Sequence, residues 1–321
     1  MLYRSNPPCA FVWNLEMDLN ADLGFLLKES MRKIGISQIG QRDLVYEYFN
    51  LKKRTLSKRP RRIVRSREFG YPQEYEQALE DFEDAVRNGK NLNVYLTDSI
   101  TTPAKSDALL YDWNIVHFHL TRRFRKDGFA QRSNYQIFAW VTDDCLYMIQ
   151  TYPHSMKYLY SRQEMLRIIE DNWPQLLEPY RLPDVASLSE VFTDEEYSKL
   201  RKANVSTLVQ TRENHVYGLM GGGYMSDGSS GEARRNANYW GNHLHICEQI
   251  IKDNMKNIIS AIQSARGDIS PDFEIRLVKL PRNADEMTVV EVRNFIGIQL
   301  LRKQKQLRIY RIEEECEVGG V

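Results

Sequence analysis

Three segments in the first third of the chain carry hydrophobic residues at the spacing of an amphipathic helix. The first begins at Asn20, a candidate N-cap, and ends at Gly35, and the second covers residues 43–53. The third follows Pro72, a residue that suits the first turn of a helix, and stops before Gly89. Its hydrophobic positions recur four, three and four residues apart: Tyr75, Leu79, Phe82 and Val86.

From residue 91 onward the pattern changes to short segments rich in β-branched and aromatic residues, which predicts a sheet. The last two of these strands form an antiparallel hairpin that turns at Asp143 and Asp144. A capping box of Ser161 and Glu164 then begins a helix that Pro174 ends. The four predicted strands cover residues 92–96, 115–120, 135–141 and 146–152.

A second region with helices and strands follows. Thr193 and Glu196 form another capping box, and the glycine-rich stretch 221–231 precedes a clearly amphipathic helix over residues 243–265. The remaining hydrophobic segments are predicted strands at 205–211, 216–220, 273–280, 288–292 and 307–312. The pattern as a whole predicts an α+β protein in three parts: a basic helical segment 1–71, an α+β domain 72–182 and a C-terminal α+β domain 183–321.

Composition narrows the class of protein. The 321 residues are 42% hydrophobic and 27% charged, which is typical of a globular protein and excludes disordered, collagen-like and coiled-coil classes. The chain has no long apolar run and its N-terminus lacks the apolar core of a signal peptide, so we expect a soluble, cytoplasmic protein without membrane contact. No CxxC spacing occurs, so the cysteines are expected to be buried thiols: Cys9, Cys145, Cys247 and Cys316.

The net charge of +1 hides a strongly basic N-terminal region, in which residues 1–70 hold 14 Lys or Arg against 7 Asp or Glu. A dense run of bases repels itself unless it is solvated or binds an anion, and an array of phosphates is the commonest such partner. We therefore expect contact with RNA or another nucleic acid, and a solvated face hinged at Pro60 is the alternative. The run contains Lys52, Lys53, Arg54, Lys58, Arg59, Arg61, Arg62, Arg65 and Arg67.

The segment DWNIVHFHLTRRFR, residues 112–125, has the most suggestive chemistry. Alternate side chains of a strand share a face, so His117 and His119 project together, and His154 lies just beyond the hairpin. Imidazole titrates near neutral pH and guanidinium binds phosphate through two parallel bonds, so this set is suited to moving protons and holding a phosphodiester. The arginines concerned are Arg122, Arg123, Arg125 and Arg132.

Two other interpretations of these histidines stay open. A His-x-His pair can begin a metal site, but no third ligand stands at a recognised spacing, so no metal or cofactor is expected. The histidines can also be purely structural. In NHLHIC, His243 and Cys247 share a helix face whereas His245 diverges, which favours a buried thiol beside a histidine over a metal site.

The glycine-rich stretch begins with Gly221, Gly222 and Gly223. Successive backbone N–H groups in a glycine loop can cradle an anion, and Arg234 and Arg235 follow. The stretch matches neither GxGxxG nor the P-loop pattern, so a flexible connection or a mobile loop is favoured over a nucleotide site. Three consecutive glycines predict high mobility.

The order of a helix, a strand ending in HFHL, an arginine-containing connection, the hairpin IFAWVTDDCLYMIQTY and His154 resembles the RelE/ParE group of small bacterial toxins. The likeness covers residues 72–173. It implies a RelE-like antiparallel sheet with flanking helices, and many members of the RelE branch are ribonucleases that cleave mRNA. Carried over by position, it implies phosphate-binding or transition-state-stabilising roles for Arg122, Arg123, Arg125 and Arg132, and acid or base roles for His117, His119 or His154.

The leading hypothesis is a toxin-like or defence-associated bacterial ribonuclease. It cleaves RNA without a metal through His117, His119, Arg123 and His154, and an antitoxin-like protein is a further candidate partner. The alternative is a non-catalytic nucleic-acid-binding or protein-interaction module, in which the basic run binds phosphates. An oligomeric scaffold is a third interpretation.

Overall fold

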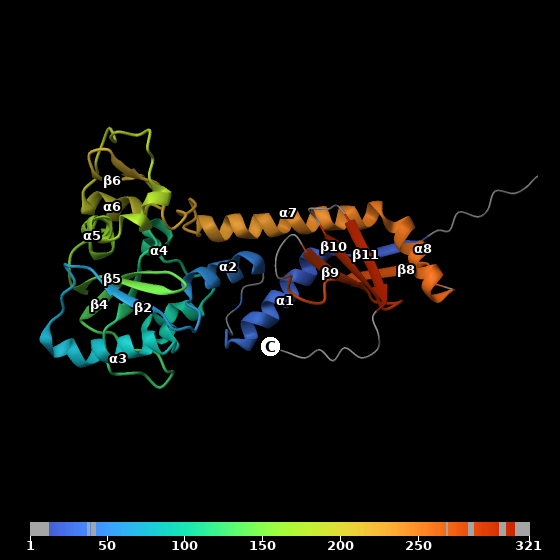
Figure 1. The fold of residues 1–321 in the computed structure, drawn as a ribbon, viewed down its shortest axis with the longest axis horizontal. Coiled ribbons are helices and arrows are strands. Elements are labelled where there is room, and N and C mark those ends of the chain that lie inside the picture. The colour runs from blue at the N-terminus through green and yellow to red at the C-terminus, as the bar shows by residue number, and fades with distance from the viewer. Residues whose placement is uncertain are drawn as a thin grey trace, which may run out of the picture. The chain divides into compact units, whose positions relative to one another are not determined.

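The computed structural model describes residues 13–36, 39, 43–267, 269–281, 286–301 and 306–311. Over these residues the chain forms eight α-helices and three β-sheets (Figure 1), which confirms the predicted α+β class. No helix in this part of the chain is long and apolar enough to cross a membrane. Two compact units divide the chain: unit 1 contains residues 1–35 and 237–321, and unit 2 contains residues 36–236.

Unit 2 is built around a four-stranded sheet. Its strands, in spatial order, are β2 (Arg62–Arg65), β5 (Cys145–Pro153), β4 (Tyr135–Val141) and β3 (Val116–His119). β3, β4 and β5 pair antiparallel, and the predicted turn at Asp143 and Asp144 is confirmed by the bond from the Thr142 N–H to the Cys145 carbonyl at 2.8 Å. β2 runs parallel to β5, so the sheet is mixed and not wholly antiparallel as predicted.

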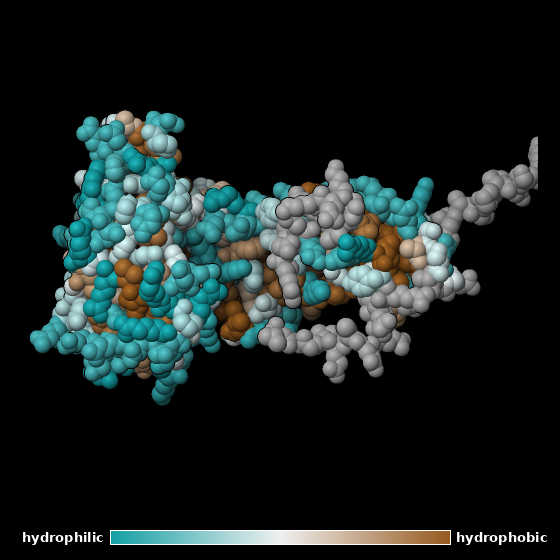
Figure 2. Space-filling view, viewed as in Figure 1, coloured by the Kyte–Doolittle hydropathy of each residue, from teal (hydrophilic) through white to brown (hydrophobic). Residues whose placement is uncertain are grey.

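Hydrophobic clusters cover both faces of this sheet. On one face, α3 (Glu76–Arg87) buries Leu79 and Phe82 against Phe118 and its neighbours. Its other side is acidic, and the face of unit 2 seen in Figure 2 is hydrophilic over α3. The opposite face of the sheet is covered by a cluster that includes residues of α4 (Ala108–Trp113) and α5 (Glu164–Asn172).

Unit 2 also contains two further helices and a two-stranded sheet, which come before or after the four-stranded sheet in the chain. The capping box of Thr193 and Glu196 is confirmed: the Thr193 hydroxyl accepts from the Glu196 N–H, and the Glu196 carboxylate accepts from the Thr193 N–H. These elements are α2 (Leu44–Arg54), α6 (Asp194–Lys202), β6 (Val209–Arg212) and β7 (His215–Tyr217). Short 3-10 turns cover Gln73–Tyr75, Leu92–Tyr95, Asp98–Thr101, Leu159–Ser161, Pro174–Leu176 and Glu178–Tyr180.

Unit 1 has its own sheet and its own core. The sheet runs β1 (Asn14–Met17), β8 (Asp272–Arg276), β9 (Glu286–Glu291), β10 (Ile296–Leu301) and β11 (Gln306–Arg311), with β1 parallel to β8 and the other pairs antiparallel. Its helices are α1 (Leu19–Lys33), α8 (Met255–Arg266) and the part of α7 (Gly231–Asp253) from residue 237 onward. Apolar residues of these helices and strands are buried, among them Leu23, Leu244, Ile258, Phe273 and Val289.

Several expected elements differ from the structure. Residues 92–96 are a 3-10 turn and not a strand, because the Asn91 side chain accepts from the Asn93 N–H and tightens the chain there. The capping box of Ser161 and Glu164 is wrong, since Glu164 instead accepts from Arg162 and Tyr152.

The C-terminal helix also differs from the prediction. The helix expected over 243–265 is two helices, α7 and α8, which meet at Asn254. The basic segment supplies β2 to the sheet of unit 2. Of the cysteines, Cys145 and Cys247 are buried as expected, whereas Cys9 and Cys316 lie outside the described residues.

Candidate functional site

The two histidines of β3 lie on one face of the sheet, as the sequence predicts. In the strand register His117 stands opposite Phe138 and His119 opposite Gln136 of β4. The His117 ring stacks on Phe138 at a centroid distance of 5.9 Å and packs against Tyr160 at 5.2 Å. The Tyr160 hydroxyl donates to the Gln136 amide oxygen at 3.0 Å. The imidazole of His117, the phenol of Tyr160 and the amide of Gln136 are therefore in a continuous chain of contacts.

Burial sets the protonation of these imidazoles. His119 is 6% exposed, and burial lowers its pKa to about 4, with further lowering by His117, Arg132 and His154. Burial also lowers the pKa of His117, an effect that Asp107 opposes and His154 reinforces. Both imidazoles are therefore neutral at pH 7.

Each of the two imidazoles also has an unsatisfied nitrogen. The Nδ1 atoms of His117 and His119 are buried, and neither has a hydrogen-bond partner among the residues that the structure describes. A buried polar atom without a partner costs about 1 to 3 kcal/mol, so such atoms are rare in structural clusters and need an explanation.

His117 and Tyr160 line a cavity of about 280 Å³ in unit 2. Arg54 of α2 enters from another side, and Asp107, the N-cap residue of α4, lies at the same cavity. The remaining wall is mostly apolar and comes from the 3-10 turns, α4 and β3: Leu96, Ile100, Ala108, Leu109, Leu110 and Val116. A concave apolar pocket with a few polar groups is the usual form of a ligand site.

The structure gathers only part of the predicted arginine set. The charges of Arg132 and His154 contribute to lowering the pKa of His119, but no hydrogen bond joins their side chains to the paired histidines among the described residues. Arg122 instead pairs with Asp81 of α3 at 2.7 Å, and Arg125 pairs with Asp98 and Asp127 at 2.7 and 2.5 Å.

Arg123 and His154 are exposed side chains. The backbone of Arg123 is bound to Thr121 and Gln131, and no contact of its guanidinium with the histidines is found in the described part of the chain. Of these two arginines, Arg132 and not Arg123 contributes to the lowered pKa of His119.

The basic run does not form a single cationic face. Arg54 and Arg61 are buried, and their guanidinium groups donate to backbone carbonyls. Lys53 pairs with Glu232 at 2.5 Å, Arg59 with Asp143 at 3.0 Å, and Arg65 with Glu83. Three exposed side chains of the run have no hydrogen bond or ion pair to described residues: Lys52, Lys58 and Arg62.

The three glycines of the glycine-rich stretch have a packing role. The N–H of Gly221 donates to the Asp112 carbonyl at 3.0 Å, that of Gly222 to Leu219 at 3.0 Å, and that of Gly223 to Tyr111 at 2.7 Å. A Cβ on Gly221 would collide with the end of α4, at 2.5 Å from the Tyr111 carbonyl carbon. These amides are already used within the fold, so they do not form an anion cradle.

The histidines of α7 behave as the helical spacing predicts. His243 and Cys247 are buried on one face, with Cys247 Sγ 3.7 Å from His243 Nε2, whereas His245 is exposed. Among the described residues no group of three His, Cys, Asp or Glu side chains is arranged to hold a metal ion.

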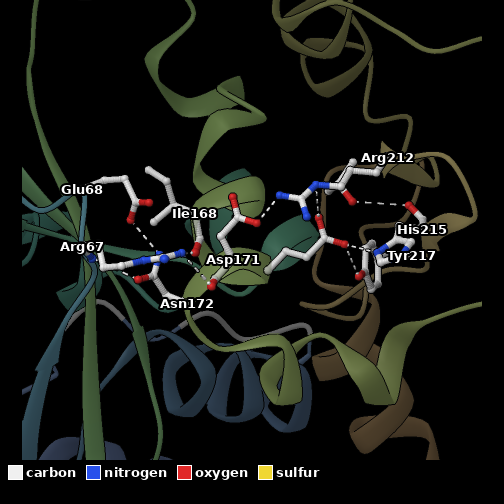
Figure 3. A network of polar contacts seen from close by, with 10 residues as sticks. Arg67, Glu68, Ile168, Asp171, Asn172, Arg212, His215 and Tyr217 are labelled. Atoms are coloured by element: carbon white, nitrogen blue, oxygen red, sulfur yellow. Dashed lines mark hydrogen bonds and ion pairs between the residues drawn. The ribbon is translucent and has the colours of Figure 1, made fainter.

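A second polar cluster of unit 2 was missed by sequence reasoning. Figure 3 shows that Asp171, Arg212, His215 and Tyr217 lie together. Arg212, His215 and Tyr217 contact Glu170, and Arg212 also pairs with Asp171. The Tyr217 hydroxyl donates to Glu170 Oε1 at 2.8 Å, His215 Nδ1 bonds the same oxygen, and Arg212 lies 3.7 Å from Oε2.

The Glu170 carboxylate is buried, and its charge together with burial raises the pKa of Tyr217. The residues of this cluster come from α5 and from the neighbouring strands β6 and β7, which lie about 40 residues further along the chain. The spacing of Arg212, His215 and Tyr217 gives no sign that they meet a glutamate of a preceding helix.

Comparison with known proteins adds no relative. None of the protein-family models, curated proteins or solved structures compared with the chain matches it significantly.

Proposed function

We propose that unit 2 binds RNA and cleaves it without a metal ion, in the manner of a toxin-like or defence-associated ribonuclease. The observation that supports this proposal is that His117 lines a cavity and shares a strand face with His119, and that the charges of Arg132 and His154 contribute to lowering the pKa of His119. RNA cleavage of this kind needs a base, an acid and a positive charge on the phosphorane, and these residue types supply all three.

The roles follow from burial. His117 is neutral and lines the cavity, so it accepts the proton of the ribose 2′-hydroxyl as that oxygen attacks phosphorus. Arg132 stabilises the negative charge that develops on the phosphorane. His154, which is exposed, donates a proton to the leaving 5′-oxygen. The products are a 2′,3′-cyclic phosphate and a 5′-hydroxyl.

His119 has a different role in this scheme. It is 6% exposed and is not among the residues that line the cavity, whereas His117 is. It therefore packs beside His117 on the same strand face and does not itself transfer a proton. The assignment also replaces Arg123 with Arg132 as the arginine at the phosphate.

The second candidate is a non-catalytic nucleic-acid-binding module. The burial of His119 favours it, because a largely enclosed imidazole is common in structural positions. In that case the exposed basic side chains of Lys52, Lys58 and Arg62 bind phosphates, and the histidines have only a structural role beside the cavity.

The two candidates are separated by an assay of the purified full chain on free and ribosome-bound RNA in the presence of EDTA. The ribonuclease proposal expects cleavage with 2′,3′-cyclic phosphate ends, and loss of that cleavage on Arg132→Lys but not on Arg122→Lys, since a point charge cannot replace a bidentate fork. Binding without cleavage supports the module, and cleavage that EDTA abolishes contradicts the metal-free mechanism.

A further inference from the structure

The cavity beside His117 carries polar groups that the proposed chemistry does not use. Arg54 is 4% exposed, and its terminal nitrogens donate to the carbonyls of Ser99, Thr102 and Pro103 at 2.7 to 3.3 Å. These bonds fix the guanidinium. Its Nε is fully buried and has no hydrogen-bond partner among the described residues, and the Arg54 side chain lines the cavity, so it contributes a fixed positive charge to the wall.

Asp107 supplies an acceptor to the same cavity. Its Oδ1 accepts from the Leu110 N–H at 3.1 Å as the cap of α4, and this is the one hydrogen bond to its carboxylate found among the described residues. The carboxylate therefore has acceptor capacity left for a ligand. The cavity wall therefore carries an acceptor, Asp107, beside the fixed positive charge of Arg54.

The charges and the walls define the class of occupant. One arginine and one aspartate balance, so the lining favours a neutral, dipolar group over a phosphate. Tyr160 and His117 offer aromatic faces, and the other walls are mostly apolar. At about 280 Å³ the cavity holds a single small ring system and not a large cofactor.

We infer that this cavity binds one nucleobase of a single-stranded RNA, stacked on Tyr160 and bound at its polar edge by Asp107, beside the buried charge of Arg54. Nucleobases are planar, neutral and carry adjacent donors and acceptors, and proteins bind unpaired bases by stacking them on aromatic side chains. The inference rests on the proposed function, in which the phosphodiester next to that base lies at His117 and Arg132.

Binding of free nucleosides tests the cavity without requiring cleavage. The four ribonucleosides are titrated separately into the full chain, with ribose 5-phosphate as a probe that has a phosphate but no base, and the side-chain NMR signals of His117 and Tyr160 are followed. We expect at least one nucleoside to shift both signals in a saturable way, and ribose 5-phosphate to leave them in place.

Two variants locate the binding. Asp107→Asn keeps a good helix cap but replaces a charged acceptor, and Tyr160→Leu removes the stacking face, so each weakens nucleoside binding about tenfold. Asp143→Asn, an exposed aspartate at the β4 to β5 turn, makes the same chemical change elsewhere and leaves binding unchanged.

Failure of this inference is distinguishable from failure of the proposed function. Nucleoside binding without any RNA cleavage keeps the base pocket and retires the ribonuclease. Cleavage with no saturable nucleoside shift, with equal shifts from ribose 5-phosphate, or with unchanged binding in both cavity variants, overturns the base pocket alone.

Discussion

Unit 2 contains two polar clusters with histidines, and they differ in what their side chains contact. In the Glu170 cluster, His215 and Tyr217 both bond Oε1 of one buried carboxylate, and Arg212 lies 3.7 Å from Oε2, which has no hydrogen bond among the described residues. On β3, the buried Nδ1 atoms of His117 and His119 have no hydrogen-bond partner within the described ranges. The first cluster ties α5 to the β6 and β7 hairpin, whereas the second opens on a cavity.

This difference separates a structural role from a functional one. A polar cluster whose side chains bond one another stabilises the fold, and its loss appears as lost stability. A polar group at the wall of a cavity can contact a ligand, so its loss appears in binding or catalysis. Residue type alone does not distinguish the two clusters, because both contain a histidine beside a tyrosine.

The largest expected loss of stability follows removal of Glu170. Glu170→Ala leaves His215, Tyr217 and Arg212 without their shared partner, so we expect the free energy of unfolding to fall by about 3 to 5 kcal/mol, as for a broken buried ion pair. Urea denaturation measures it. Glu178→Ala serves as the control because its pair with Arg181 is exposed at 3.9 Å, and a loss equal to that control would contradict the structural role.

A smaller loss is expected at the glycine-rich stretch. Gly221→Ala places a Cβ against the backbone at the end of α4, so we expect the free energy of unfolding to fall by about 1 to 3 kcal/mol. At Gly70 an added Cβ would have its nearest neighbour at 3.9 Å and the φ angle is not positive, so Gly70→Ala changes stability by no more than about 0.5 kcal/mol. Equal stability of the two variants would contradict this prediction, because it would mean that the backbone moves away from the added Cβ without loss of stability.

The buried imidazole of His119 gives a pH dependence of similar size. Its folded pKa of about 4 lies below the ordinary value of 6.5, so the unfolded chain binds more protons between these two pH values. Stability is fully present above pH 6.5 and is lost as the pH falls toward 4, by about 2 kcal/mol after allowance for solvent screening. In His119→Gln this part of the pH dependence disappears, and an unchanged profile would place the imidazole in solvent.

The smallest effect on stability is expected at the basic run, where the effect is on binding. Changing Lys52, Lys58 and Arg62 together to Ala leaves the fold intact within about 0.5 kcal/mol because these side chains are exposed. If they contact phosphates, the slope of log affinity for RNA against log salt falls by up to about 2 to 3. The matched control Arg122→Ala, Arg125→Ala removes cations already paired with acids. An unchanged slope in the triple variant rejects direct contact.

The sequence predicts well where local chemistry decides the structure. α3, the β4 to β5 hairpin and the capping box at Thr193 depend on residues close in the chain, and each lies where the pattern places it. β2 was missed because an edge strand with arginines at both ends reads as part of a charge run.

The candidate site could be predicted only in part, for a physical reason. Two-residue alternation on β3 places His117 and His119 on one face, but Arg54 and Asp107 reach the cavity from α2 and from the cap of α4. Their meeting depends on tertiary packing, which no local spacing encodes. The basic residues of the run differ in whether they form ion pairs for the same reason. Acids that are distant in the sequence, such as Glu83 and Glu232, pair with some of them and not with others.

The most direct test of the functional contrast compares His117→Gln with His215→Gln in the RNA cleavage assay, each rate divided by the folded fraction measured under the assay conditions. We predict that His117→Gln lowers the rate by about 100- to 10,000-fold with little change in stability, since a positioned proton acceptor is lost. His215→Gln lowers stability but keeps the rate per folded molecule. Equal rates in the two variants, or a wild-type chain that cleaves no RNA, would contradict the account.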